Sequence, residues 1–231
     1  MNYPIYLTNM NRLSTTKKMV EDLFRLDGAS RITIIDNAST YPPLLEWYKK
    51  VKNDINIIYQ GENKGCWTFF YSGHYSKCKE NYYIYSDCDL ELNPNMPSNW
   101  QEILMEWHKK YNRKASLVLR LDDIPEGELK EKIKNHQNIC WGKTEDENVY
   151  HGVTDMTFSF DSKQAGYRFD SVRIGGDFAC RHLPWYLDMN NLPEEEKYYL
   201  NHLDGRFPEA IWSKLNKERI YGQTRNHQSS N

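Results

Sequence analysis

Residues 82–92 read YYIYSDCDLEL. In this segment a β-prone apolar run leads into two carboxylates, Asp87 and Asp89, which are separated by Cys88. The run predicts a strand that ends at the first carboxylate. Two adjacent carboxylates repel each other, and hard cations such as Mg²⁺ and Mn²⁺ prefer oxygen ligands. The segment therefore predicts a cation site at a strand end, although the same spacing also occurs at ordinary turns.

The composition favours a single large α/β domain that spans residues 1–231. Hydrophobic residues make up 39% of the 231 residues, which is enough for a sizeable core. The formal net charge of −2 provides no basic field that would recruit nucleic acid. No apolar stretch approaches the roughly 20 residues that span a bilayer, so we expect no transmembrane segment.

The five cysteines form no Cys-x-x-Cys pair and are odd in number. We interpret them as free thiols in a reducing compartment. The N-terminus has no signal-peptide pattern. These features predict a cytoplasmic protein, and they leave open a peripheral contact with a membrane.

Strand and helix signals alternate along the first part of the chain. Apolar and β-branched runs predict strands at residues 4–7, 31–35, 55–59 and 82–86. Amphipathic patterns predict helices at residues 14–26 and 42–51, and a third helix that begins near Gly65. This alternation is typical of a parallel, doubly wound sheet.

The second part of the chain shows weaker signals. Ser98 and Gln101 fit a capping box for a helix that ends near residue 111. The pattern also predicts strands at residues 115–121, 154–160 and 168–174, and a short helix at residues 126–135. Pro193 and the acidic residues after it predict the start of a last helix.

Polar residues follow each of the first four predicted strands, at residues 8–12, 36–40, 60–65 and 87–89. In open α/β sheets, ligands bind beyond the carboxyl ends of the strands. Polar residues also gather in loops without any function. Their occurrence after four strands of one sheet is more specific than any single loop, and it predicts a ligand site at this edge.

The four loops together resemble the GT-A glycosyltransferases, in particular the family 2-like group. That group has a strand ending in Asp-Asn-x-Ser-Thr, here residues 36–40, then Asn-x-Gly, here residues 63–65, and then the Asp-x-Asp motif. The resemblance covers residues 1–121 best. It implies a mostly parallel, Rossmann-like sheet flanked by helices, with a nucleotide-sugar half at residues 1–121. Residues 122–231 would form a mixed, acceptor-side half.

The resemblance also implies the residues that bind the nucleotide. Asp36 would accept a hydrogen bond from the base, which in this group is usually uracil. The residues expected around the nucleotide and its sugar-phosphate are Thr8, Asn11, Arg12, Asn63, Lys64 and Gly65.

The resemblance further implies that Asp89 binds a metal ion directly and that Asp87 faces the ribose or the metal's water shell. His182 is the best candidate for a third metal ligand, because enzymes of this group often use a C-terminal histidine. A packed, hydrogen-bonded histidine is the alternative. Cys88 departs from the group, in which an acidic or apolar residue is common.

The general base should come from the second half of the chain. Asp155 is favoured because its spacing from Asp89 resembles that between the metal motif and the base in several inverting GT-A enzymes. Asp122 and Asp123 are the next candidates, followed by Asp170 and Asp177. Each could instead be a solvated or capping carboxylate.

These features predict a metal-dependent glycosyltransferase with Mn²⁺ or Mg²⁺ as cofactor. It would move a sugar from a nucleotide-diphosphate donor, with a UDP-sugar favoured, to a hydroxyl of a glycan or glycolipid, with inversion. A cation would stabilise the charge that grows on the leaving diphosphate. Retention requires a different geometry, and the sequence leaves both outcomes open.

Three rival functions share parts of this pattern. A sugar nucleotidyltransferase normally has a glycine-rich loop after the first strand, and residues 8–13 contain no glycine. A phosphohydrolase normally carries Asp-x-Asp after its first strand. A non-catalytic nucleotide-sugar-binding module is disfavoured because both carboxylates are intact.

Overall fold

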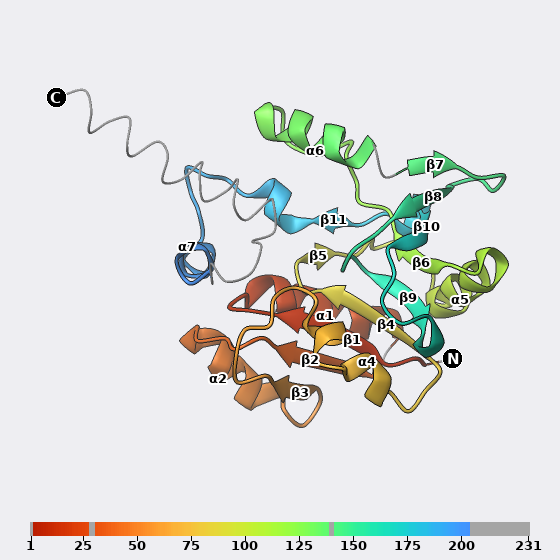
Figure 1. Ribbon diagram of the computed structural model, residues 1–231. Helices are drawn as coiled ribbons and strands as arrows, with labels where there is room; N and C mark the ends of the chain where they lie inside the picture. Colours follow the sequence, from red (N-terminus) through yellow and green to blue (C-terminus); the bar gives the residue numbers. More distant parts are fainter. Residues whose placement is uncertain (1, 28–30, 139–140, 204–231) are drawn as a thin grey trace.

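The computed structural model describes residues 2–27, 31–138 and 141–203. Its first half alternates strands and helices as the sequence predicts (Figure 1). The strands are β1 (Ile5–Asn9), β2 (Ile32–Asp36), β3 (Asn56–Tyr59) and β4 (Tyr82–Asp87). The helices between them are α1 (Ser14–Asp27), α2 (Pro42–Val51), α3 (Thr68–Tyr71) and α4 (His74–Lys77).

Within the described residues, nine strands form one sheet in the order β3-β2-β1-β4-β9-β6-β10-β8-β7. Strands β1 to β4 are parallel. Strand β9 (Ser159–Ser162) runs antiparallel between β4 and β6 (Lys114–Leu117), and β10 (Asp170–Ile174) is parallel to β6. The antiparallel pair β8 (Val149–Val153) and β7 (Trp141–Lys143) completes the sheet. The predicted parallel sheet with a mixed second half is therefore confirmed.

Alternating side chains give the sheet two separate cores. Ile5 and Leu7 of β1 and Ile84 of β4 pack in one cluster with α1 and with α5 (Trp100–Tyr111). Tyr83 and Tyr85 of β4 point to the opposite face, where they pack with the aromatic residues of α3. Because both faces are covered, the open edges at the strand ends are the places left for a ligand.

Two small elements lie beyond the carboxyl ends of the parallel strands. Strands β5 (Leu90–Glu91) and β11 (Arg181–His182) form an antiparallel pair. Helix α7 (Glu194–Asn201) lies on the side to which the arrows of β1 and β2 point (Figure 1). The remaining elements are α6 (Glu128–Asn138) and 3₁₀ helices at Lys163–Ala165, Gly176–Phe178 and Leu183–Tyr186.

Three local predictions are wrong. Residues 154–158 are irregular, and the strand begins only at Ser159. The predicted capping box is absent, because Asn99 precedes α5 without a side-chain cap and the Gln101 side chain accepts a hydrogen bond from the Tyr3 N–H at 2.7 Å. Strand β6 ends at Leu117, four residues before its predicted end, and the chain then makes only an isolated bridge from Leu119 to Cys180.

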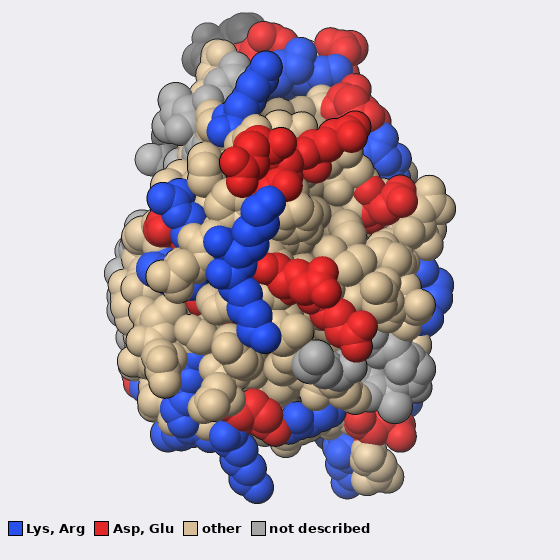
Figure 2. Space-filling view, turned by 90° about the vertical axis from the view of Figure 1, so that its right-hand side faces the viewer, with Lys and Arg blue, Asp and Glu red and all other residues tan. Residues whose placement is uncertain are grey.

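The surface shows no segregation of charge on the face seen in Figure 2, where basic and acidic side chains are interleaved. Among the described residues, no helix is both long enough and apolar enough to span a membrane. The cysteines in the described part, Cys66, Cys78, Cys88 and Cys180, are free thiols, as predicted. Cys140 lies outside the described residues.

Candidate functional site

The carboxyl ends of β1, β2 and β4 lie side by side at one edge of the sheet. Asn9 at the end of β1 pairs in register with Asp36 of β2, and Thr8 pairs with Asp87 of β4. These polar strand ends are therefore neighbours, as the loop pattern predicts. Thr8 is buried within this row.

Asn11 connects the loop after β1 with the loop after β2. It is buried and has a φ of 56°, a left-handed conformation that asparagine tolerates better than most residues. Its Oδ1 accepts hydrogen bonds from the N–H groups of Thr40 (2.7 Å) and Tyr41 (2.9 Å), and its own N–H donates to Ser39 Oγ at 2.9 Å. Asn11 thus holds the two loops together, and its side-chain oxygen is already engaged in hydrogen bonds within the protein.

Asp36 offers one buried oxygen to a ligand. Its Oδ1 accepts a hydrogen bond from the Ser39 N–H at 3.0 Å, whereas its Oδ2 has no hydrogen-bond partner among the described residues. Burial raises the pKa of the Asp36 carboxyl, and hydrogen bonds from the side chains of Ser39 and Tyr48 to this carboxyl oppose the rise. A buried acceptor without a partner costs free energy, so such an atom normally binds a ligand or an ordered water.

Asn37 organises the loop that carries Asn63, Lys64 and Gly65. Its Nδ2 donates to Asn63 Oδ1 (2.7 Å) and to the Gly65 carbonyl (3.0 Å), and its Oδ1 accepts from the Lys64 N–H (2.9 Å). Asn63 Oδ1 also accepts from the Gly65 N–H at 2.9 Å. Asn37 was not among the predicted site residues, although it directly follows Asp36 in the predicted ligand loop.

Asp89 lies in a buried cluster of charged side chains. Its Oδ2 pairs with Arg12 Nη1, and its Oδ1 lies 3.6 Å from His182 Nε2. Arg12 also pairs with Glu196 of α7, with 3.2 Å between Nη2 and Oε2. Burial alone would raise the pKa of Asp89, but His182 and Arg12 hold it well below its usual value. Arg12 was expected near the nucleotide, and its guanidinium is instead buried between two carboxylates.

The short β5–β11 pair explains why His182 lies beside Asp89. His182 is opposite Leu90 in this ladder, and the Leu183 N–H donates a hydrogen bond to the Asp89 carbonyl at 2.9 Å. The residue predicted as a third metal ligand is thus held against the Asp-x-Asp segment by main-chain pairing.

A divalent cation fits Asp89 and His182. Asp89 Oδ1 is buried and has no hydrogen-bond partner among the described residues, and the imidazole lies next to it. Mg²⁺ often uses one or two protein ligands, with phosphates and waters in the other positions. In the described part of the chain, however, no three His, Cys, Asp or Glu side chains are grouped to hold a metal ion. Asp89 and His182 are therefore the two direct ligands that we consider, and Asp87 keeps its predicted place at the ribose or in the metal's water shell as an untested expectation.

Asp87 lies close to Asp155 as well as to Asp89. Burial and the carboxylates of Asp89 and Asp155 raise the pKa of Asp87 well above its usual value. The exposed thiol of Cys66 is close to the same two carboxylates, Asp87 and Asp155. The charges of Asp89 and Asp155 thus both act on the Asp87 carboxyl.

Asp155 is exposed in the irregular segment that precedes β9. The Asp87 N–H donates a hydrogen bond to the Met156 carbonyl at 3.1 Å, which fixes this segment beside the Asp-x-Asp motif. The buried amine of Lys114 donates to the carbonyls of Thr154 and Asp155, the latter at 3.1 Å. The main chain around Asp155 is therefore anchored while its carboxylate stays open to solvent.

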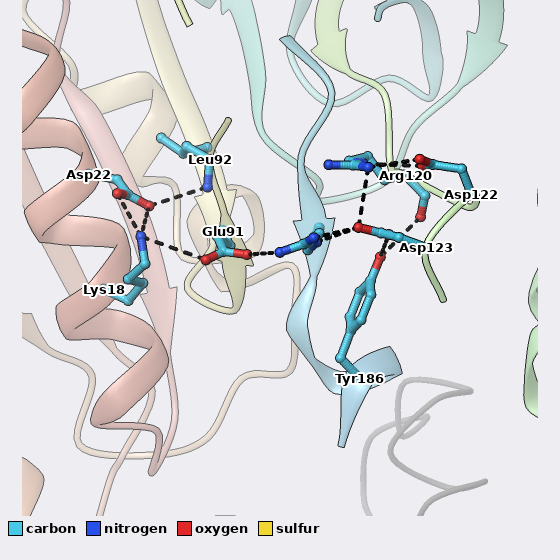
Figure 3. A network of polar contacts seen from close by, with 9 residues as sticks. Lys18, Asp22, Glu91, Leu92, Arg120, Asp122, Asp123 and Tyr186 are labelled. Carbon is cyan, nitrogen blue, oxygen red and sulfur yellow. Dashed lines mark hydrogen bonds and ion pairs between the residues drawn. The ribbon is translucent and has the colours of Figure 1, made fainter. Parts of the chain in front are cut away.

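The alternative bases Asp122 and Asp123 are engaged in ion pairs (Figure 3). Arg120 Nη2 lies 2.7 Å from Asp122 Oδ2, and Arg181 Nη2 lies 2.6 Å from Asp123 Oδ2. The Tyr186 hydroxyl donates to Asp123 Oδ1 at 2.7 Å. Burial alone would raise the pKa of Asp123, but Tyr186 and Arg181 hold it below its usual value.

The same network extends across the molecule to α1 (Figure 3). Arg181 Nη1 lies 3.0 Å from Glu91 Oε2, and Lys18 bridges Glu91 (3.9 Å) and Asp22 (2.7 Å). Arg181 thus joins β11 to β5 and to the loop after β6.

The two other candidate bases lie in different surroundings. Asp170 begins β10, a strand that runs parallel to β6, and it pairs with Arg113 at 3.0 Å. It is therefore at the amino edge of the sheet, opposite to Asp87. Asp177 is exposed in the 3₁₀ helix after β10.

No family model and no curated protein matches this sequence. Solved structures do match the fold. A mannosyltransferase from Pyrobaculum calidifontis, in complex with GDP-Man and Mn²⁺, matches with a TM-score of 0.50 at 10% identity, over 100% of this chain and 76% of the other. S. aureus TarS (1–349) matches with a TM-score of 0.51 at 10% identity, over 97% and 73%.

GalNAc-T7 with UDP, GalNAc and Mn²⁺ matches with a TM-score of 0.52 at 14% identity, over 99% of this chain and 52% of that protein. These likenesses establish the architecture, and at such low identity they carry no donor, acceptor or metal to this chain. The chain has the GT-A fold of nucleotide-sugar transferases.

Proposed function

We propose that this chain is a metal-dependent glycosyltransferase that moves a sugar from a UDP-sugar to a hydroxyl of a glycan or glycolipid, with inversion. The observation that carries the proposal is the pair of Asp89 and His182 at the ligand edge of a GT-A fold. The Asp89 Oδ1 is buried and has no hydrogen-bond partner in the described part of the chain, and it lies 3.6 Å from His182 Nε2.

Asp36 supports a role in recognising the base. Its Oδ2 is a buried acceptor at the end of β2, and a uracil ring offers an N–H donor of matching polarity. The interlocked amides of Asn37 and Asn63 hold the adjacent loop rigidly, which favours binding because less conformational entropy is lost.

Asp89 and His182 would hold the divalent cation, Mn²⁺ or Mg²⁺. When bound, the cation would neutralise part of the charge that develops on the leaving diphosphate. Asp87 is close to Asp155 as well as to Asp89, and we assign it to the ribose or to a water of the cation.

Asp155 is the proposed base. Its exposed carboxylate would take the proton of the acceptor hydroxyl while the acceptor oxygen forms a bond to the anomeric carbon. The bond between that carbon and the phosphate oxygen breaks, and the nucleoside diphosphate leaves with the electron pair. Anchoring of the Asp155 main chain by Lys114 supports this role, because a base must be held at a fixed position.

A panel of UDP-, GDP- and dTDP-sugars with Mn²⁺ tests the proposal through thermal stabilisation and slow donor hydrolysis. We expect UDP-sugars to stabilise the protein in the presence of Mn²⁺ and to be hydrolysed slowly. Absence of both effects with every sugar nucleotide would contradict a transferase function. Formation of a sugar nucleotide from a nucleoside triphosphate and a sugar phosphate would instead support the rival nucleotidyltransferase. Binding without turnover would support a non-catalytic module.

A further inference from the structure

Four aromatic side chains form a continuous row beside the proposed base. We call this set the aromatic row, and its members are Trp67, Tyr71, Tyr167 and Phe169. The ring centroids of Trp67 lie 5.6 Å from Tyr71 and 6.0 Å from Tyr167, and Tyr167 lies 5.0 Å from Phe169. The row joins α3 to the segment between β9 and β10, which are far apart in sequence.

The aromatic row is the main site of exposed apolar surface. Within the described part of the chain, four large hydrophobic side chains are exposed. Two of them, Tyr71 (65%) and Phe169 (47%), belong to the row, and Val153 (47%) adjoins Phe169 because the Thr154 N–H bonds to the Phe169 carbonyl at 2.9 Å. Single exposed apolar residues need no explanation, but a contiguous group marks a binding surface.

The aromatic row lies beside an exposed polar group, the Asp155 carboxylate. The polar atoms of the row itself are buried, and a hydrogen bond joins the side chains of Trp67 and Tyr167. Exposed ring faces next to a carboxylate suit a ligand that is apolar on one face and rich in hydroxyls at its edge. A sugar ring has this character, whereas an acyl chain would offer the carboxylate no hydrogen-bond donor.

The aromatic row lies against the segment that carries Asp155. The hydrogen bond between Thr154 and Phe169 fixes the two segments together, and Met156 packs in the same cluster as Trp67 and Tyr167. The Asp155 carboxylate is close enough to Tyr167 to raise the pKa of its hydroxyl, in addition to the effect of burial.

We propose that the aromatic row is the acceptor subsite and that it stacks on a pyranose ring of a glycan acceptor, so that one hydroxyl reaches Asp155. This inference rests on the proposed function and narrows its acceptor to a saccharide. The ligand that we infer for the aromatic row is the sugar itself. A lipid surface is the alternative ligand, which the experiment distinguishes from it.

Variants Tyr71→Ala and Phe169→Ala test the inference, because both side chains are exposed and their removal should leave the fold intact. Methyl pyranosides serve as acceptors and a UDP-sugar with Mn²⁺ as donor, and transfer and donor hydrolysis are measured in the same samples. We expect each variant to raise the acceptor KM by about fivefold to tenfold, with kcat and donor hydrolysis unchanged. Tyr59→Ala removes a similarly exposed ring outside the row and should leave the acceptor KM unchanged.

Tyr167→Phe keeps the ring and removes only the buried hydroxyl, so the acceptor KM should stay unchanged in this variant. Unchanged acceptor KM in Tyr71→Ala and Phe169→Ala, with donor hydrolysis intact, would overturn the inference. So would loss of binding to phosphatidylcholine vesicles in the variants while pyranoside transfer stays normal. Absence of donor hydrolysis in the unmodified protein would instead contradict the proposed function.

Discussion

The buried amine of Lys114 donates a hydrogen bond to the main-chain carbonyl of Asp155 over 3.1 Å. The same amine bonds to the Thr154 carbonyl and, at 3.1 Å, to the Tyr85 hydroxyl. Lys114 itself is fully buried in β6. A side chain of the sheet thus fixes the position of an exposed carboxylate that lies 41 residues later in the chain.

Lys114→Met should separate the chemical step from donor binding. The variant leaves two carbonyls without their donor, so the segment that carries Asp155 loses its anchor. We expect kcat for transfer to fall by about tenfold or more, because misplacement by about 1 Å can cost a hundredfold. The dissociation constant of UDP should stay unchanged in calorimetry. Lys109→Met, an exposed change in α5, is the control, and equal effects of both variants on kcat would contradict this role.

Lys114 should also make stability depend on pH. Burial lowers its pKa to about 7, whereas an unfolded lysine has a pKa of about 10.4. Between these values the unfolded chain binds more protons, so this residue adds stability as pH rises, by up to about 1.4 kcal/mol per pH unit. The buried thiols make the protein less stable as pH rises. They are present in both the unmodified protein and Lys114→Met, so their effect cancels in a comparison of the two. The free energy of unfolding is measured with urea from about pH 7 to about pH 9. Over this range the unmodified protein should gain about 2 kcal/mol of stability relative to Lys114→Met. Parallel pH curves for the two proteins would contradict this prediction.

Asn37→Ala should weaken both the fold and UDP binding. It removes hydrogen bonds to Asn63, Lys64 and Gly65, and it leaves the Lys64 N–H and the Gly65 carbonyl without these partners. We expect a loss of about 1–3 kcal/mol in the free energy of unfolding and a higher dissociation constant for UDP. Asn53→Ala, an exposed change in the turn after α2, should affect neither. Tight UDP binding by Asn37→Ala would show that this loop does not border the nucleotide.

The strands in the first half of the sheet could be predicted from the composition of each segment alone. Residues 32–35 are all β-branched, so β2 was predictable from its own composition. Strand β8 was not predicted, because His151 and Gly152 interrupt its apolar pattern and its place in the sheet depends on pairing with β10. Residues 154–158 have strand-like composition but are bent away to pack beside Asp87.

The candidate site also has a part that local sequence predicts and a part that it does not. Asp36 and Asp89 follow local strand signals, and each lies at the predicted edge. The partners of Asp89 could not be derived from local patterns, because Glu196 meets Arg12 across 184 positions of sequence. The acidic residues after Pro193 predicted a helix start, and the structure adds that Glu195 and Glu196 are buried against residues 12–14.

Asp155→Asn should abolish transfer but retain donor binding. The amide cannot take the proton of the acceptor hydroxyl, and the main-chain bonds to Lys114 and Asp87 do not involve the changed atoms. We expect kcat for transfer to fall by about 10²–10⁴-fold at an unchanged dissociation constant for UDP. Asp177→Asn, an exposed alternative on the 3₁₀ helix after β10, is the matched comparison. Loss of transfer in Asp177→Asn alone would move the base to that residue.

The most direct test of the central claim is calorimetric titration of UDP into the unmodified protein and into Asp89→Asn, with and without Mn²⁺. Asp54→Asn, the same change at an exposed position after α2, serves as control. The account predicts that UDP binds tightly only when Mn²⁺ is present, that Asp89→Asn loses this dependence together with at least about tenfold in affinity, and that Asp54→Asn behaves like the unmodified protein. UDP binding that is independent of Mn²⁺, or that Asp89→Asn leaves unchanged, would contradict it.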